Sequence, residues 1–294
     1  MNKVGFIGVG IMGKSMVRNL MKAGFELHIY ARTKSKVEDV ISEGAQFHES
    51  IKDFVQDCDA VITIVGFPQD VEEVYFDGGN ILDSAKKGAY LIDMTTTSPQ
   101  IAEKIYEEGT KRGFHVMDAP VTGGDTGAKA GTLSILVGGE KEDYEACMPL
   151  FEAMGTNINY QGKAGCGQHC KLANQIMIAG TLSGVCEALT YAKEQGLDPE
   201  VFMKSVATGA AGSKQLDTFG PKILKDDYAP GFFMKHFIKD MKLALIEANR
   251  KGLSLDVLSM VLANYEELEQ EGYGDLGTQA LMKFYDEELR NTEE

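Results

Sequence analysis

The chain has 294 residues, about the length of two domains, and its hydrophobic fraction of 44% and charged fraction of 25% exclude a disordered polymer. Its 44 acidic residues outnumber the 29 lysines and arginines, and the resulting net charge of −15 argues against nucleic acid or a membrane surface as partner. Glycines interrupt the first residues, the apolar stretch Ile176–Cys186 is shorter than the roughly 20 residues of a membrane span, and five scattered cysteines suit reduced thiols. We therefore expect a soluble, cytoplasmic protein.

The first half alternates short runs of apolar residues with segments of helical periodicity. Helical segments such as Ile11–Ala23 and Pro99–Arg112 separate the apolar runs. The predicted strands are Lys3–Ile7, Glu26–Tyr30, Ala60–Val65, Tyr90–Asp93, His115–Asp118 and Ser134–Val137. This alternation predicts an α/β fold with a Rossmann-type, doubly wound parallel sheet.

The second half contains no convincing strand. A long helix is predicted from His169 to about Gln195. Further helices are predicted at Pro199–Ala207, Gly212–Leu224, Phe237–Lys251 and Leu255–Gln270. We place the domain boundary near Lys163, so that residues 1–163 form the α/β domain and residues 164–294 form an all-α domain entered through one long helix.

A glycine motif follows the first predicted strand and opens the first helix. Gly8, Gly10 and Gly13 form a G-x-G-x-x-G pattern, with Val9, Ile11 and Met12 between them. In such a motif the first glycine permits a tight turn, the second lets the backbone approach a pyrophosphate, and the third lets the helix pack on the sheet. The N-terminus of the helix offers unpaired N–H groups to the phosphates. We therefore expect residues 1–163 to bind a dinucleotide.

The end of the second predicted strand indicates which dinucleotide is bound. An NAD site normally has an acidic residue there, but this chain has Ala31, and Arg32, Thr33, Lys34 and Lys36 come after it. An arginine can form paired hydrogen bonds to a 2′-phosphate, so NADP is favoured over NAD. The alternative is that these are solvated loop residues, and an acid from another strand end, such as Asp70, would undo the assignment.

Two later segments indicate a substrate site. The segment from Asp118 to Gly124 follows a strand and places Thr122 beside Gly123 and Gly124, whose backbone N–H groups suit a carboxylate. The second segment, Gly165–Gln175, leads into the long helix and puts Lys171 in its first turns. A lysine there, partly buried between domains, should have a lowered pKa suited to acid–base chemistry.

Metal binding is the weaker interpretation of the same region. Cys166, His169 and Cys170 lie close together in sequence, but a second pair of ligands is missing. We therefore expect reduced thiols and no metal ion.

Together these segments resemble the β-hydroxyacid dehydrogenase family, which contains 3-hydroxyisobutyrate dehydrogenase, tartronate semialdehyde reductase and the glyoxylate/succinic semialdehyde reductases. The matching blocks span essentially the whole chain and occur in the family's order. They are 8–13, 93–96, 118–124, 165–175 and 239–240. Thr122 stands where serine is commoner in the family, and Gln175 stands where many members have asparagine.

The resemblance implies roles for individual residues. Lys171 would be the catalytic acid, and Lys239 would close over the nicotinamide half of the cofactor with Phe232 nearby. The substrate-binding residues would be Thr122, Gly123, Gly124, Asn174 and Gln175. The cofactor-binding residues would be Gly8, Val9, Gly10, Ile11, Met12, Gly13, Arg32, Thr33, Lys36, Val65, Thr96, Phe232 and Lys239. Relatives bury their helical domains in dimers or tetramers, so a homodimer or homotetramer is expected.

The leading hypothesis is an oxidoreductase that moves a hydride between NADP(H) and a small carboxylate-bearing semialdehyde or 3-hydroxy acid. The alternatives are an NAD-dependent 3-hydroxyisobutyrate-type dehydrogenase and a non-catalytic NADP-binding sensor. An imine-reducing relative is disfavoured because such enzymes usually replace the lysine that stands here at Lys171.

Overall fold

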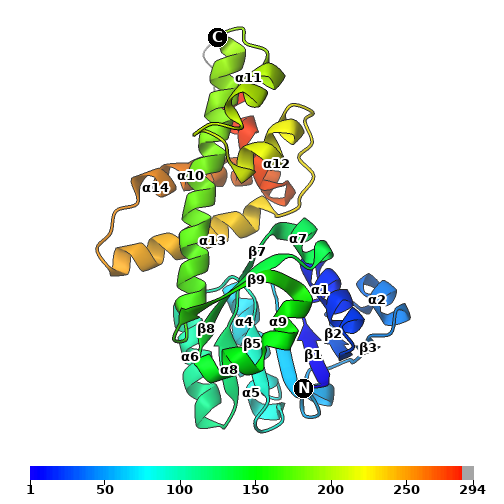
Figure 1. Cartoon of the computed structure of the whole chain (residues 1–294). Coiled ribbons are helices and arrows are strands. Elements are labelled where there is room, and N and C mark those ends of the chain that lie inside the picture. Colours follow the sequence, from blue (N-terminus) through cyan, green and yellow to red (C-terminus); the bar gives the residue numbers. More distant parts are fainter. Residues whose placement is uncertain (287–294) are drawn as a thin grey trace. The chain divides into compact units, whose positions relative to one another are not determined.

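The computed structural model describes residues 1–286. The chain divides into two compact units, one formed by Met1–Lys171 and the other beginning at Leu172. The division falls within helix α10 (Cys166–Glu194), the long helix in Figure 1.

The first unit is built on a nine-stranded sheet with the strand order β3-β2-β1-β4-β5-β6-β8-β7, and β9 also pairs with β8. The neighbouring strands from β3 to β6 are parallel, whereas β8 runs antiparallel to β6. The strands are β1 (Lys3–Ile7), β2 (Glu26–Tyr30), β3 (Gln46–Phe47), β4 (Ala60–Thr63), β5 (Tyr90–Asp93), β6 (His115–Asp118), β7 (Val121–Thr122), β8 (Leu133–Gly139) and β9 (Gly155–Gly162).

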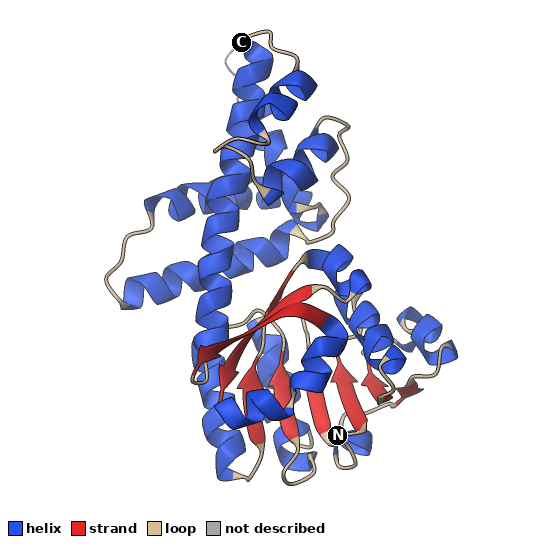
Figure 2. Ribbon diagram, viewed as in Figure 1, coloured by secondary structure: helices blue, strands red, loops and turns tan. Residues whose placement is uncertain are grey.

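Helices cover both faces of this sheet (Figure 2). The helices of the first unit are α1 (Ile11–Lys22), α2 (Glu38–Ser42), α3 (Lys52–Val55), α4 (Pro68–Phe76), α5 (Ile81–Ser84), α6 (Pro99–Lys111), α7 (Gly124–Ala130), α8 (Lys141–Ala146) and α9 (Met148–Met154). Because successive side chains of a strand point to opposite faces, Phe6 joins the core formed with α1 and α9, whereas Ile7 joins the core formed with α4 and α6. A sheet buried on both faces explains why its strands read as nearly continuous apolar runs.

The predicted architecture is confirmed, but the sheet differs from the prediction in the direction of β8 and in three strands that were not predicted, β3, β7 and β9. Strand β8 is antiparallel because α7, with seven residues, spans about 10 Å and is too short to return the chain to the opposite edge of the sheet. Strand β9 was missed because it is polar and largely exposed, so it lacks the apolar alternation that identifies a strand.

Within the part that the structure describes, the second unit contains helices joined by loops and no strand, apart from one isolated β-bridge between Phe233 and Gly277. Besides the remainder of α10 it contains α11 (Pro199–Val206), α12 (Lys214–Ile223), α13 (Met234–Arg250), α14 (Asp256–Gln270) and the short turns η2 (Tyr273–Asp275) and η3 (Thr278–Leu281). Its core is formed by apolar residues of α10, α13 and α14, among them Leu182, Phe237 and Tyr265.

Helix α10 is long and apolar enough to pass a membrane-span test by length and composition. Its most apolar window has a mean hydropathy of 1.2, and 44% of that window is buried inside the structure. Leu172, Leu182 and Leu189 of this helix belong to the hydrophobic core of the second unit. Burial in this core accounts for part of the apolar character of α10, whereas Met177 and Tyr191 of the same helix are exposed.

Candidate functional site

The three glycines after β1 have three different surroundings. Gly8 has a φ of +98°, and a Cβ built on it would lie 2.1 Å from the carbonyl oxygen of Ile64. A Cβ on Gly13 would lie 2.1 Å from the oxygen of Gly8, so the helix packs tightly on the turn. Among the described residues, nothing lies within 4 Å of a Cβ built on Gly10. The side chain of Ile11 is also exposed, although it is large and apolar.

This arrangement suits a dinucleotide. Two glycines are needed because protein backbone approaches them, whereas Gly10 borders open space at the N-terminus of α1, where a pyrophosphate would meet free N–H groups. The residues present therefore fit the cofactor that the motif predicts.

The basic residues after β2 lie in the same unit. Thr33 precedes the short 3₁₀ helix η1 (Lys34–Lys36), and Arg32, Thr33 and Lys36 are all exposed. The guanidinium of Arg32 does not stand alone, because its Nη2 donates to Oδ1 of Asp70 in α4. Asp70 is the residue whose position was identified from the sequence as able to undo the NADP assignment.

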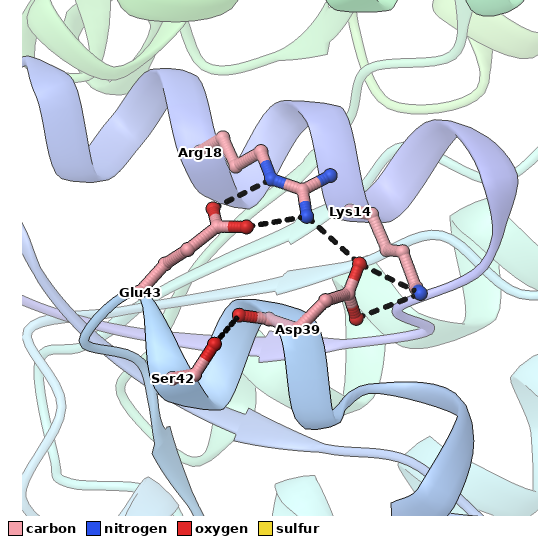
Figure 3. Close-up of polar contacts among 5 residues, drawn as sticks. All are labelled: Lys14, Arg18, Asp39, Ser42 and Glu43. Carbon is pink, nitrogen blue, oxygen red and sulfur yellow. Dashed lines mark hydrogen bonds and ion pairs between the residues drawn. The ribbon is translucent and has the colours of Figure 1, made fainter.

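An ion-pair cluster joins α1 to α2 (Figure 3). Lys14 and Arg18 of α1 donate to Asp39, and Arg18 also donates to both oxygens of Glu43 at 2.7 Å. These contacts hold the pKa of Glu43 below its usual range. The sequence offered no signal for this cluster, because its members are about 20 positions apart on exposed helix faces.

Val65 and Thr96 follow the ends of the neighbouring strands β4 and β5. The backbone N–H of Val65 donates to the hydroxyl of Thr95 at 3.0 Å, which ties the two strand ends together. Thr96 is half-buried between the buried residues Thr95 and Thr97. The carboxyl ends of β1, β2, β4 and β5 meet at one edge of the sheet because these strands are parallel, and the predicted cofactor residues of the first unit follow them there.

Two buried carboxyl groups lie side by side at that edge. Asp93 and Asp118 are paired in the register of β5 and β6, and only 2% and 3% of their surfaces are exposed. Burial raises the pKa of Asp93 to about 6, although the Thr63 hydroxyl donates to it at 2.8 Å. Burial also raises the pKa of Asp118.

Asp118 and Gln168 anchor the start of α10. The backbone N–H groups of Gly165 and Gln168 each donate to Asp118 at 2.8 Å. The buried Gln168 side chain accepts from the N–H of Thr97 and donates to the oxygen of Thr95. These four bonds attach the first turn of the helix to the ends of β5 and β6.

Gly167 lets α10 approach the sheet closely enough for these bonds. A Cβ at this position would lie 2.4 Å from the oxygen of Leu136 and 2.7 Å from the oxygen of Asp118. The two glycines that precede Lys171 in sequence therefore serve the seating of the helix: Gly165 supplies a donor to Asp118, and Gly167 permits the contact. Lys171 lies one turn further along and is buried, with 7% of its surface exposed.

The predicted substrate loop lies after β6. Thr122 ends β7 and is half-buried, and Gly123 precedes α7. Gly123 and Gly124 have φ values of +131° and +65°, which only glycine adopts readily. The two glycines are thus required by the backbone of this turn.

The second unit brings together Asn174, Gln175 and Lys239 around a residue that was not among the predicted site residues. The Gln175 amide accepts from Asn174 at 2.8 Å and donates to Asp240 at 2.6 Å. Asp240 is fully buried and forms an ion pair with Lys239 at 3.0 Å. Gln175 and Asp240 are 65 positions apart, so spacing alone could not connect them. Phe232 is half-buried and lies just before α13. Its ring stacks on that of His236, in the first turn of the helix.

Within residues 1–286, no group of three His, Cys, Asp or Glu side chains is placed to hold a metal ion. Cys166 and Cys170 are half-buried thiols on α10.

Comparison with known proteins identifies both halves of the chain. Residues 3–162 match the family model for the NAD binding domain of 6-phosphogluconate dehydrogenase. Residues 165–285 match the model described as NAD-binding of NADP-dependent 3-hydroxyisobutyrate dehydrogenase.

Similar proteins support the same family over nearly the full length. An uncharacterized oxidoreductase, YkwC, of Bacillus subtilis is 49% identical over 96% of this chain and 98% of that protein. The 2-hydroxy-3-oxopropionate reductase of Escherichia coli is 37% identical over 86% of each chain. The structure of 3-hydroxyisobutyrate dehydrogenase from Mycobacterium tuberculosis with L-serine has a TM-score of 0.88 and 26% identity, and it covers 96% of this chain and 98% of that one. The resemblance found from the sequence motifs is thereby confirmed, and the chain belongs to the β-hydroxyacid dehydrogenase family of NAD(P)-dependent oxidoreductases.

Proposed function

We propose that this enzyme reduces a small carboxylate-bearing semialdehyde with NADPH, and oxidises the corresponding 3-hydroxy acid in the reverse direction, with Lys171 as the general acid or base. The observation that carries this proposal is the burial of Lys171 in the first turns of a helix whose start is bonded to two strand ends. Lysine side chains are rarely buried in proteins, because removing the ammonium group from water costs free energy. A buried lysine therefore indicates a functional role.

The bound nicotinamide supplies the hydride. As negative charge develops on the carbonyl oxygen of the substrate, Lys171 stabilises it and donates a proton from Nζ. In the oxidation direction the neutral amine accepts the proton instead. Thr122 and the N–H groups of Gly123 and Gly124 hold the substrate carboxylate and so determine which carbonyl reacts.

The residues of the second unit have a supporting role in this proposal. Asn174 binds the substrate directly, and Gln175 holds Asn174 and Asp240 in place because its oxygen and nitrogen bond to those two residues. Lys239, paired with Asp240, contacts the nicotinamide half of the cofactor together with Phe232.

NADP is the proposed cofactor because no acid follows β2, and Arg32, Thr33 and Lys36 are exposed there. Arg32 can form two hydrogen bonds to a 2′-phosphate, and Lys36 adds a second positive charge. The NAD-dependent 3-hydroxyisobutyrate-type dehydrogenase is the second candidate, favoured by the ion pair that already engages Arg32.

The test is turnover of a semialdehyde panel, including glyoxylate and the succinic, tartronate and methylmalonate semialdehydes, followed by NADPH absorbance. Lys171→Ala should lower turnover at least about 10²-fold while NADPH binding stays nearly unchanged. Lys193→Ala is the matched control, because Lys193 lies on the same helix and is exposed. Unchanged turnover in Lys171→Ala would refute the mechanism, and no turnover of any substrate by the wild type would favour an NADP-binding sensor.

We also propose a homodimer or homotetramer that acts in the cytoplasm on a small molecule, without nucleic acid or membrane partners. Large apolar side chains of the second unit support self-association, since Met177, Tyr191, Val257 and Met260 are at least half exposed. Light scattering during size-exclusion chromatography tests this proposal, and a monomer at micromolar concentration would refute it.

A further inference from the structure

The ion pair between Arg32 and Asp70 occupies the side chain on which NADP recognition is proposed to depend. Asp70 is the third residue of α4, and its other oxygen accepts from the backbone N–H of Phe67 at 2.9 Å. The Asp70 carboxylate is thus held in place by the backbone of its own helix start, independently of Arg32. Arg32 is the more exposed partner, with 63% of its side chain exposed against 17% for Asp70.

A 2′-phosphate and Asp70 require the same guanidinium. Asp70 cannot withdraw without losing its bond to Phe67, so a phosphate must either displace it from Arg32 or share Arg32 with it. A second acid, Glu73, lies close enough to act on the charge of Arg32. Lys34 is another cation in the loop, and it already pairs with Glu49 at 3.8 Å. The surroundings of Arg32 are therefore less positive than the sequence after β2 indicates.

We infer that Asp70 is a specificity-determining residue that weakens binding of the 2′-phosphate and thereby narrows the preference for NADP over NAD. This inference rests on the proposed role of Arg32 in NADP binding. Neutralising Asp70 removes a competitor for the guanidinium and a repulsive charge near the phosphate. NADH has no phosphate at that position, so its binding should not respond.

The experiment measures dissociation constants of NADPH and NADH by calorimetric titration of the full-length protein. The variant is Asp70→Asn, because asparagine keeps an oxygen that can accept from Phe67 and preserves the start of α4. The matched control is Asp83→Asn. Asp83 also accepts from a backbone N–H near a helix start and pairs with an arginine, Arg112, but it precedes β5 and lies at the opposite edge of the sheet.

In Asp70→Asn we expect NADPH to bind about two- to fivefold more tightly, the range that a partly exposed ion pair allows. NADH binding should be unchanged, as should the binding of both cofactors to Asp83→Asn. The gain should shrink at high salt, because exposed charges are screened. Unchanged or weaker NADPH binding in Asp70→Asn would overturn the inference and would mean that Asp70 holds Arg32 in a useful position.

The variant Arg32→Ala separates this inference from the proposed function. If Arg32→Ala weakens NADPH binding but Asp70→Asn does not strengthen it, the inference fails and the NADP assignment stands. If Arg32→Ala leaves NADPH binding unchanged, the NADP assignment itself fails, and the inference fails with it.

Discussion

Replacing Gly167 by alanine should test whether stability and activity depend on the close contact between the start of α10 and the sheet. The added Cβ would lie 2.4 Å from the oxygen of Leu136, and relief to an ordinary contact near 3.4 Å requires a movement of about 1 Å, the difference between these distances. This oxygen and the nearby oxygen of Asp118 both belong to the backbone of the sheet, so the helix has to move. Overpacking costs about 1–3 kcal/mol, and loss of the charge-assisted bond from Gln168 to Asp118 costs about 1.5–3 kcal/mol.

Alanine recovers about 0.5–1 kcal/mol of helix propensity, so the net loss of unfolding free energy should be about 1.5–5.5 kcal/mol. A displacement of about 1 Å in a positioned catalytic group costs on the order of 10²-fold in rate, so kcat should fall while NADPH affinity changes little. Urea denaturation and steady-state kinetics measure the two effects.

Gly184→Ala is the control, on the same helix. Gly184 is exposed, and among the described residues nothing lies within 4 Å of a Cβ built on it. This variant should be unchanged or slightly more stable, by about 0.5–1 kcal/mol. A Gly167→Ala protein as stable and as active as the wild type would refute the role of the close contact.

Three further variants test other parts of the first unit. Gly10→Val should abolish NADPH binding in calorimetric titration without lowering Tm, since the space beside it is open; retained affinity would mean that the cofactor binds elsewhere. Because burial raises the pKa of Asp93 from 3.8 to about 6, the folded state binds its proton more tightly, and stability should decline by up to about 3 kcal/mol as pH rises from about 4 to about 6. Asp93→Asn should flatten that decline in urea titrations at several pH values, and an unchanged pH profile would contradict the assignment. Arg18→Ala should lower unfolding free energy by about 1 kcal/mol or less at low salt and by less at high salt, whereas a salt-independent loss would show that packing dominates.

The central strands of the first unit were predictable because burial on both faces requires nearly continuous runs of apolar residues, which are visible in the sequence. Four predicted strands, Lys3–Ile7, Glu26–Tyr30, Tyr90–Asp93 and His115–Asp118, have the observed limits. The edge strand β9 was not predictable, since solvent on its exposed positions imposes no apolar pattern.

Site residues were predictable where backbone geometry demands a residue type, and not where a partner comes from a distant segment. The glycines before α1 fall in the first class because their spacing fixes the turn. Gln168 and Asp240 fall in the second class, as does the pairing of Asp70 with Arg32, although Asp70 itself was named from the sequence. Their partners, Arg32, Thr95 and Gln175, become neighbours only when the tertiary structure forms.

The attachment of α10 to Asp118 has a consequence for how the chain folds during synthesis. Both backbone donors to this buried carboxyl group, at Gly165 and Gln168, come later in the sequence than Lys163, where the strand-rich half was predicted to end. A nascent or truncated chain that stops at residue 163 would bury Asp118 without them, at a cost of about 1–3 kcal/mol for each unsatisfied bond. The nucleotide-binding half should therefore remain open on the ribosome until the first turn of α10, which belongs to the first unit, has emerged.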